Sequence, residues 1–146
     1  MRSVSAAFDV ILRANNEEAS LKAYHQLLYA VGNNHAGTYY SVALGILPAV
    51  ESVLLDGSPW AKQAVLEVLI ELCGPFRPES GQELYQGVSL EVLIKERVAS
   101  LAPIVGTLAK GEEVAAKSAQ ELLGVMDELR TERATPTGTT DIPLSC

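Results

Sequence analysis

Residues 46–73 have the sequence ILPAVESVLLDGSPWAKQAVLEVLIELC, and this stretch decides how the chain folds. A similar pattern returns at residues 101–128 as LAPIVGTLAKGEEVAAKSAQELLGVMDE, so that Pro48 corresponds to Pro103 at an offset of 55 residues. Each copy is typical of a helix, a short polar turn and a second helix. Helical repeats of this kind bury their apolar faces by stacking on one another. The pattern therefore predicts an all-α fold.

The composition indicates one globular domain. Of the 146 residues, 48% are hydrophobic and 20% are charged, which is enough apolar material for a single core. We expect residues 1–133 to form this domain and residues 134–146, which are rich in Thr, Pro and Gly, to be a flexible polar tail. The net charge of −7 disfavours nucleic acid as a partner, because phosphate repels an acidic surface, and it is compatible with a basic protein partner. No stretch is typical of a secretion signal or a membrane span, so we expect a cytoplasmic protein.

The positions of apolar residues predict about six helices and no strand. The expected helices cover residues 3–13, 16–31, 38–55, 60–73, 83–109 and 114–132, and the one over residues 83–109 is either a long helix or a broken one. Asn16 is expected to cap the second helix, with Leu21 on its packing face. Gly32 is expected to end that helix in a left-handed conformation.

Prolines and polar turn residues divide the repeated stretches. Pro48 and Pro103 are each expected to kink a helix from inside, because proline removes a backbone donor. In the turn at residues 56–59, Ser58 is expected to cap the second helix, with Pro59 at its first position.

The first copy resembles a HEAT repeat. That family has a proline in the first helix, an Asp in the turn and a Val-Arg or Val-Lys pair early in the second helix. Here these positions are Pro48, Asp56 and Ala61 followed by Lys62, with Ala64 at the expected small position. The resemblance implies that Lys62 has a structural role and pairs with Asp56.

The second copy departs in part from the family pattern. It keeps Pro103 and Lys117 but has Gly111 where the turn Asp would fall. The resemblance implies a short right-handed HEAT-like α-solenoid of two to three helical hairpins; a non-repetitive α-bundle is the alternative. The stretch at residues 35–40 is also similar to short bacterial HEAT-type proteins, some of which are thought to lie beside toxin genes as immunity proteins.

The residues offer no recognisable catalytic or metal-binding pattern. His25 and His35 have no third ligand at metal spacing, and Cys73 closes an apolar helix without a histidine nearby in the sequence. We therefore expect a protein without enzymatic activity, metal or cofactor.

The second helices of the repeats carry polar stripes. Gln63, Glu67 and Glu71 are four residues apart and share one helix face. In HEAT-type stacks the second helices line the concave side, so the resemblance implies a mainly acidic concave surface, to which Glu18, Lys22 and Tyr29 would contribute from the preceding helix. The candidate partner-binding residues are Gln63, Glu67, Glu71, Lys117, Gln120, Glu121, Glu128, His35, Tyr39, Tyr40 and Trp60. For Trp60, an anchor for a partner and a plug between repeats both remain open.

These observations favour a protein–protein interaction module. Its most concrete form is an immunity protein that occludes a cognate bacterial toxin, with a basic toxin or nuclease as the partner. The alternatives are a small scaffold or regulatory subunit of a larger complex and, less favoured, a HEAT-like enzyme acting on nucleic acid. Self-association is left open, because short repeat arrays leave their terminal faces poorly covered.

Overall fold

The computed structural model describes residues 3–134, without the side chains of residues 130 and 132–134. The predicted polar tail lies outside the described residues, except for Ala134, which ends the last helix. The fold is predominantly helical, as expected. The helices are α1 Val4–Leu12, α2 Glu17–Val31, α3 Val42–Gly45, α4 Leu47–Asp56, α5 Pro59–Cys73, α6 Leu90–Ala99, α7 Ala102–Ala109 and α8 Ala115–Ala134.

Side-chain caps explain where several helices begin. The Oδ1 atom of Asn16 accepts a hydrogen bond from the backbone N–H of Ala19 (2.8 Å), and Oγ of Ser58 accepts one from Ala61 (3.1 Å). Each cap satisfies a backbone donor that has no partner inside the helix. Both predicted caps are confirmed.

The two repeated prolines begin helices instead of bending them. α3 ends at Gly45, and Pro48 occupies the first turn of α4; in the same way α6 ends at Ala99, and Pro103 occupies the first turn of α7. The first turn needs no backbone donor from proline, so the chain breaks just before it and starts again. The predicted internal kinks and the continuous helix over residues 38–55 are therefore wrong. Of the two forms expected for residues 83–109, a long helix and a broken one, the structure has the broken one, which begins only at Leu90.

Short strands in the loops correct the expectation of a strand-free fold. Residues 3–134 contain five strands of two residues each: β1 Gly32–Asn33, β2 Thr38–Tyr39, β3 Arg77–Pro78, β4 Leu84–Tyr85 and β5 Val88–Ser89. β1 pairs antiparallel with β2, which pairs parallel with β3, and β4 pairs antiparallel with β5. Two-residue strands are too short to leave an alternating pattern in the sequence.

Gly32 lets the backbones of β1 and β2 lie close together. Gly32 follows the last residue of α2, as expected, but its φ of −171° is extended, so the predicted left-handed conformation is wrong. A Cβ atom at this position would lie 2.3 Å from the carbonyl oxygen of Thr38 in the neighbouring strand. Only glycine therefore allows β1 to pair with β2 at this spacing.

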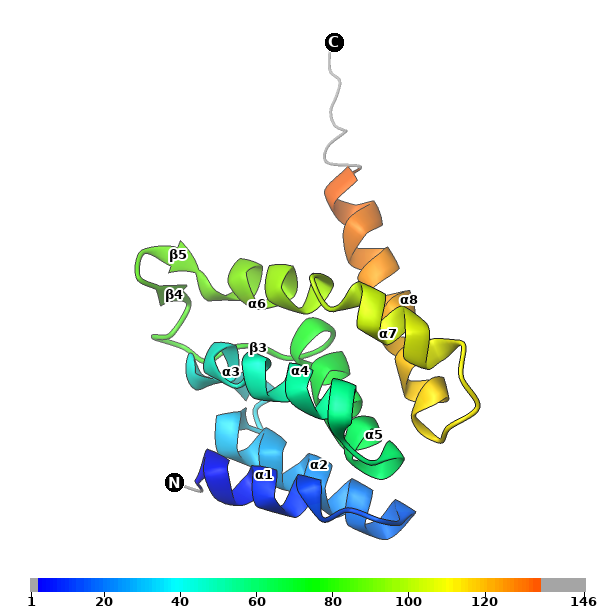
Figure 1. Cartoon of the computed structure of the whole chain (residues 1–146). Helices are drawn as coiled ribbons and strands as arrows, with labels where there is room; N and C mark the ends of the chain where they lie inside the picture. The colour runs from blue at the N-terminus through cyan, green and yellow to red at the C-terminus, as the bar shows by residue number, and fades with distance from the viewer. Residues whose placement is uncertain (1–2, 135–146) are drawn as a thin grey trace.

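The helices are stacked in chain order, from α1 and α2 at the bottom of Figure 1, through α3–α5, to α6–α8 at the top. α5 lies between α2 and α8, contacts both, and has most of its residues buried. Equivalent helices of the two repeated stretches lie against each other: α4 contacts α7, and α5 contacts α8. The helices that precede the two stretches, α3 and α6, are also in contact.

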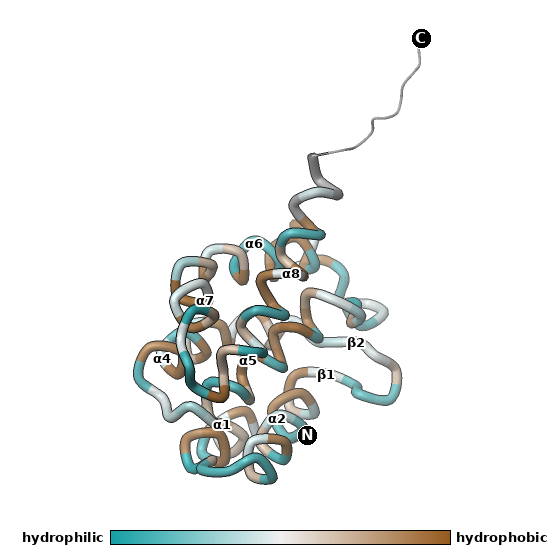
Figure 2. Tube along the Cα trace, turned by 90° about the vertical axis from the view of Figure 1, so that its right-hand side faces the viewer, coloured by the Kyte–Doolittle hydropathy of each residue, from teal (hydrophilic) through white to brown (hydrophobic). Residues whose placement is uncertain are grey.

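The loops and the helices differ in hydropathy. Hydrophobic segments recur along the helices, whereas the loop between β1 and β2 projects from their side and is largely hydrophilic (Figure 2). No helix within residues 3–134 is both long enough and hydrophobic enough to cross a bilayer.

Candidate functional site

A row of polar side chains runs along α5, which apart from this row and Lys62 is apolar. Gln63, Glu67 and Glu71 follow one another at successive turns, and all three are half-buried. Buried residues lie on both sides of Glu67 and of Glu71 in the sequence. The structure therefore brings together the three residues that the sequence placed on one face. We call them the α5 polar row.

Hydroxyl groups from α2 hold the two ends of the row. Oγ of the buried Ser20 donates to the carbonyl oxygen of Trp60 (2.9 Å) and lies 3.1 Å from Oε1 of Gln63. The hydroxyl of Tyr24 donates to Oε2 of Glu71 over 2.6 Å. These contacts fix α2 beside α5 through the polar row itself.

A hydroxyl from α8 holds the middle of the row. Oγ of the buried Ser118 donates to Oε2 of Glu67 (2.7 Å). Ser118, Ser20 and Tyr24 were not predicted as members of the site. The sequence signal was weak, because a single serine or tyrosine on a helix gives no indication of which neighbouring helix it faces.

The electrostatics of Tyr24 support this arrangement. The pKa of its phenol is raised well above the ordinary value. Burial is the largest cause, and the hydrogen bond to Glu71 and the negative charges of Glu71 and Glu67 raise the pKa further. Tyr24 therefore stays protonated and acts as a donor at neutral pH. Both donors to the carboxylates, Tyr24 and Ser118, are neutral, so they fix the positions of Glu67 and Glu71 without cancelling their charges.

α8 extends the acidic surface on one side of the row. Lys117, Glu121 and Glu128 are exposed and lie on one face of α8, next to Ser118. Gln120 points elsewhere, since its Nε2 donates to the carbonyl oxygen of Ala109 at the end of α7 (2.9 Å). Of the four predicted residues on α8, three thus share a face and Gln120 ties α8 to α7.

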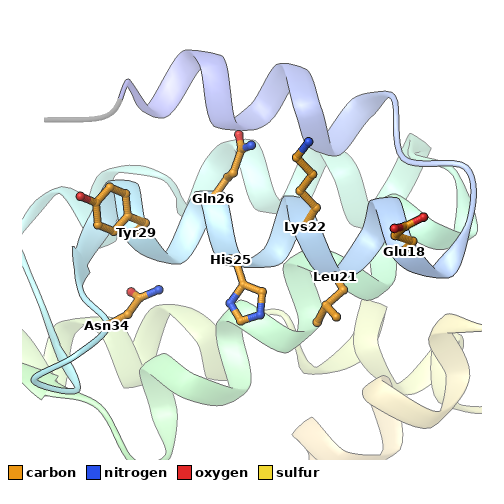
Figure 3. A pocket seen from close by; sticks show the side chains of 7 residues that line it. All are labelled: Glu18, Leu21, Lys22, His25, Gln26, Tyr29 and Asn34. Atoms are coloured by element: carbon orange, nitrogen blue, oxygen red, sulfur yellow. The ribbon is translucent and has the colours of Figure 1, made fainter.

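On the side of the α5 polar row opposite to α8, α2 contributes a shallow groove of about 620 Å³ (Figure 3). It is lined by Glu18, Leu21, Lys22, His25, Gln26, Tyr29 and Asn34. Leu21 is exposed in this groove, which contradicts its predicted place on the packing face. The ring of His25 lies 4.8 Å from the ring of Tyr24, at an angle of 57°, so the groove adjoins the polar row.

The aromatic cluster predicted around residues 35–40 is only partly at the surface. His35 is exposed in the β1–β2 loop, but Tyr39 is completely buried and Tyr40 is half-buried. Burial also raises the pKa of the Tyr39 phenol. The interpretation of Tyr39 as a contact residue is therefore wrong, because strand β2 turns its ring into the core.

Trp60 and Lys62 lie at helix junctions. Trp60 is half-buried at the start of α5, where its carbonyl meets Ser20. Lys62 does not pair with Asp56 as expected; its Nζ lies 3.6 Å from Oε1 of Glu113 in the α7–α8 turn. Lys62 thus connects one repeated stretch to the next instead of closing its own turn.

Among residues 3–134, no group of three His, Cys, Asp or Glu side chains is arranged to hold a metal ion. Cys73 is buried, and burial raises the pKa of its thiol from 9.0 to about 12, against a smaller opposite effect of Lys95. A thiol protonated at neutral pH packs as an apolar side chain.

Comparison with known proteins finds no matching protein-family model, no matching curated protein and no matching solved structure. The surface formed by α2, α5 and α8, which we call the α2–α5–α8 face, is therefore interpreted from its own residues.

Proposed function

We propose that this chain is a non-enzymatic module that binds a basic protein partner through the α2–α5–α8 face. The observation that carries the proposal is the α5 polar row, in which Glu67 and Glu71 are held in place by neutral hydroxyl donors. A charged side chain that is already fixed in position before binding loses little conformational entropy when a partner binds. Such charges favour fast and selective association with a surface of opposite sign.

The surface around the α5 polar row is negatively charged, like Glu67 and Glu71 themselves. The exposed carboxylates beside the row are Glu18 on α2 and Glu121 and Glu128 on α8. The exposed cations are Lys22 on α2 and Lys117 on α8. Carboxylates therefore outnumber cations on this face. A nucleic-acid substrate is disfavoured, because its phosphates would meet this acidic surface.

The stacking of equivalent elements supports the proposal that the chain is a short, right-handed HEAT-like solenoid. Its hairpins would be α1–α2, α4–α5 and α7–α8, with α2, α5 and α8 as the inner layer. In this arrangement the polar stripes of successive second helices form one continuous concave surface. Its most concrete role is that of a cytoplasmic immunity protein that occludes a cognate bacterial toxin.

A capture experiment tests the proposal. The tagged chain is mixed with lysate of the source organism, and bound proteins are identified by mass spectrometry. The variant Glu67→Lys/Glu71→Lys is compared with Glu51→Lys/Glu112→Lys, which makes the same change of charge at two exposed positions off this face. Melting curves identify any variant that is not folded.

The expected result is one stoichiometric basic partner that binds the wild type and the control and is lost with Glu67→Lys/Glu71→Lys. If the partner is a toxin, co-expression of the wild type restores growth to cells that produce it. Recovery of no partner, or equal recovery with both variants, would contradict the proposal.

A further inference from the structure

The groove on α2 holds the exposed hydrophobic side chains of the α2–α5–α8 face. Among the described residues, the three helices of this face expose two large hydrophobic side chains, Leu21 at 57% and Tyr29 at 52%. Both of them line the groove. The exposed hydrophobic surface that this face offers to a partner is therefore concentrated in one place.

The lining residues form a stripe along one helix. Leu21, His25 and Tyr29 follow one another at intervals of four residues, which places them along one side of α2. In Figure 3, Leu21 and His25 project to the same side of the helix, and Tyr29 lies one turn further along. Glu18 and Lys22 line the same groove with opposite charges, so charge alone does not select what enters it. An apolar side chain gains most there, because it leaves water together with Leu21 and Tyr29.

Fixed carboxylates lie next to the groove. The ring of His25 packs against Tyr24, and the hydroxyl of Tyr24 donates to Glu71. A polypeptide segment with one side chain in the groove therefore has its neighbouring residues beside the α5 polar row, where the negative charges of Glu71 and Glu67 favour lysine or arginine. Hydrophobic anchors surrounded by polar and charged contacts are the usual arrangement of a protein interface.

We infer that the α2 groove is the apolar anchor site of the proposed interface and receives a hydrophobic side chain from a partner segment that also carries lysine or arginine. The inference rests on the proposed function, because the basic residues are assigned from the charges of the α5 polar row. It adds a requirement that those charges do not set, namely an apolar side chain beside the cations. A uniformly basic segment would leave Leu21 and Tyr29 in water.

Fluorescence anisotropy with two labelled peptides tests the inference. One peptide alternates lysine with leucine, and in the other serine replaces every leucine, so that length and charge are the same. The wild type is compared with Leu21→Ser/Tyr29→Ser and with a matched control, Leu12→Ser/Leu55→Ser, whose leucines are 60% and 56% exposed on α1 and α4. Melting curves identify any variant that is not folded, and Leu21→Ser alone is the milder variant.

The wild type and the control should bind the leucine peptide at least about tenfold more tightly than the serine peptide, as expected when part of a leucine side chain is buried. Leu21→Ser/Tyr29→Ser should bind both peptides as weakly as the wild type binds the serine peptide, with Leu21→Ser in between. Equal affinity of the wild type for the two peptides, no binding of either, or a leucine preference that survives Leu21→Ser/Tyr29→Ser would overturn the inference.

Two further measurements separate the possible failures. Glu67→Gln/Glu71→Gln should weaken the binding of both peptides and keep the preference for leucine; unchanged affinity for both would count against the proposed function and not against the anchor site. Sedimentation equilibrium of the chain alone tests a different occupant. A dimer that dissociates with Leu21→Ser/Tyr29→Ser would assign the groove to a second copy and overturn the inference.

Discussion

Replacing Tyr24 by Phe removes one hydroxyl from the polar contact between α2 and α5. The ring stays, and only the 2.6 Å hydrogen bond to Oε2 of Glu71 is lost. A hydrogen bond to a charged group contributes about 1.5–3 kcal/mol, and partial exposure of both side chains places this one near about 1.5 kcal/mol. We expect Tyr24→Phe to lower the free energy of unfolding by that amount and the melting temperature by about 5 °C.

The pH dependence follows from the raised pKa of Tyr24. Because the pKa is higher in the folded state than its ordinary value of 10.0, the phenol stabilises the fold fully below about pH 10. This contribution is lost as the pH rises from there through the folded-state pKa. The difference between wild type and Tyr24→Phe should therefore be constant near neutral pH and shrink in alkaline solution.

Urea unfolding followed by circular dichroism measures the effect, and Tyr85→Phe on the exposed hairpin is the control. A double-mutant cycle with Glu71→Gln isolates the pair, for which we expect a coupling energy of at least about 0.5 kcal/mol. A loss for Tyr24→Phe no larger than that for Tyr85→Phe, or a coupling near zero, would refute the assignment of this contact.

Three further substitutions test the fold. Cys73→Ala should reduce the loss of stability between pH 9 and about 12, because the wild-type thiol, with its raised pKa, stabilises the fold only while it stays protonated; unfolding curves at several pH values measure this. Gly32→Ala should lower the free energy of unfolding by more than about 1 kcal/mol, since its Cβ would lie 2.3 Å from the Thr38 carbonyl, and urea titration would show no change if the strands separate freely. Ser58→Ala should cost about 1–2 kcal/mol, because Oγ both caps α5 (3.1 Å) and donates to the carbonyl of Ala14 (3.0 Å); a loss below about 0.5 kcal/mol in thermal unfolding would contradict this.

The parts of the fold that the sequence predicted well are those governed by local chemistry. The cap at Asn16 and the turn before α5 depend on residues within three positions of each other, so their signals survive in any packing. The α5 polar row was also predictable, since its residues interrupt an apolar helix at a regular spacing. Local rules failed at Pro48. A proline in the first turn of a new helix and a proline that kinks one long helix give the same sequence pattern, so the sequence could not distinguish the two.

Contacts between distant segments could not be predicted. Tyr39 is buried because β2 pairs with β1 and β3, and the partner strand β3 lies far along the chain. Lys62 reaches Glu113 because the turn before α8 lies beside α5. Leu21 has the spacing of a core residue, but α2 turns it toward solvent. In each case the neighbour is set by tertiary packing.

The central proposal is that fixed carboxylates on the α2–α5–α8 face bind a basic partner, and the affinity of the isosteric variant Glu67→Gln/Glu71→Gln tests it most directly. Glutamine retains an oxygen that accepts the hydrogen bonds from Ser118 and Tyr24, so the surface keeps its shape and loses two charges. Calorimetric titration with the captured partner should give an affinity at least about tenfold weaker than the wild type, or about 1.4 kcal/mol, with a smaller dependence on salt. The matched control Glu51→Gln/Glu112→Gln should bind like the wild type. Equal affinity of the two variants for the partner would contradict the proposal.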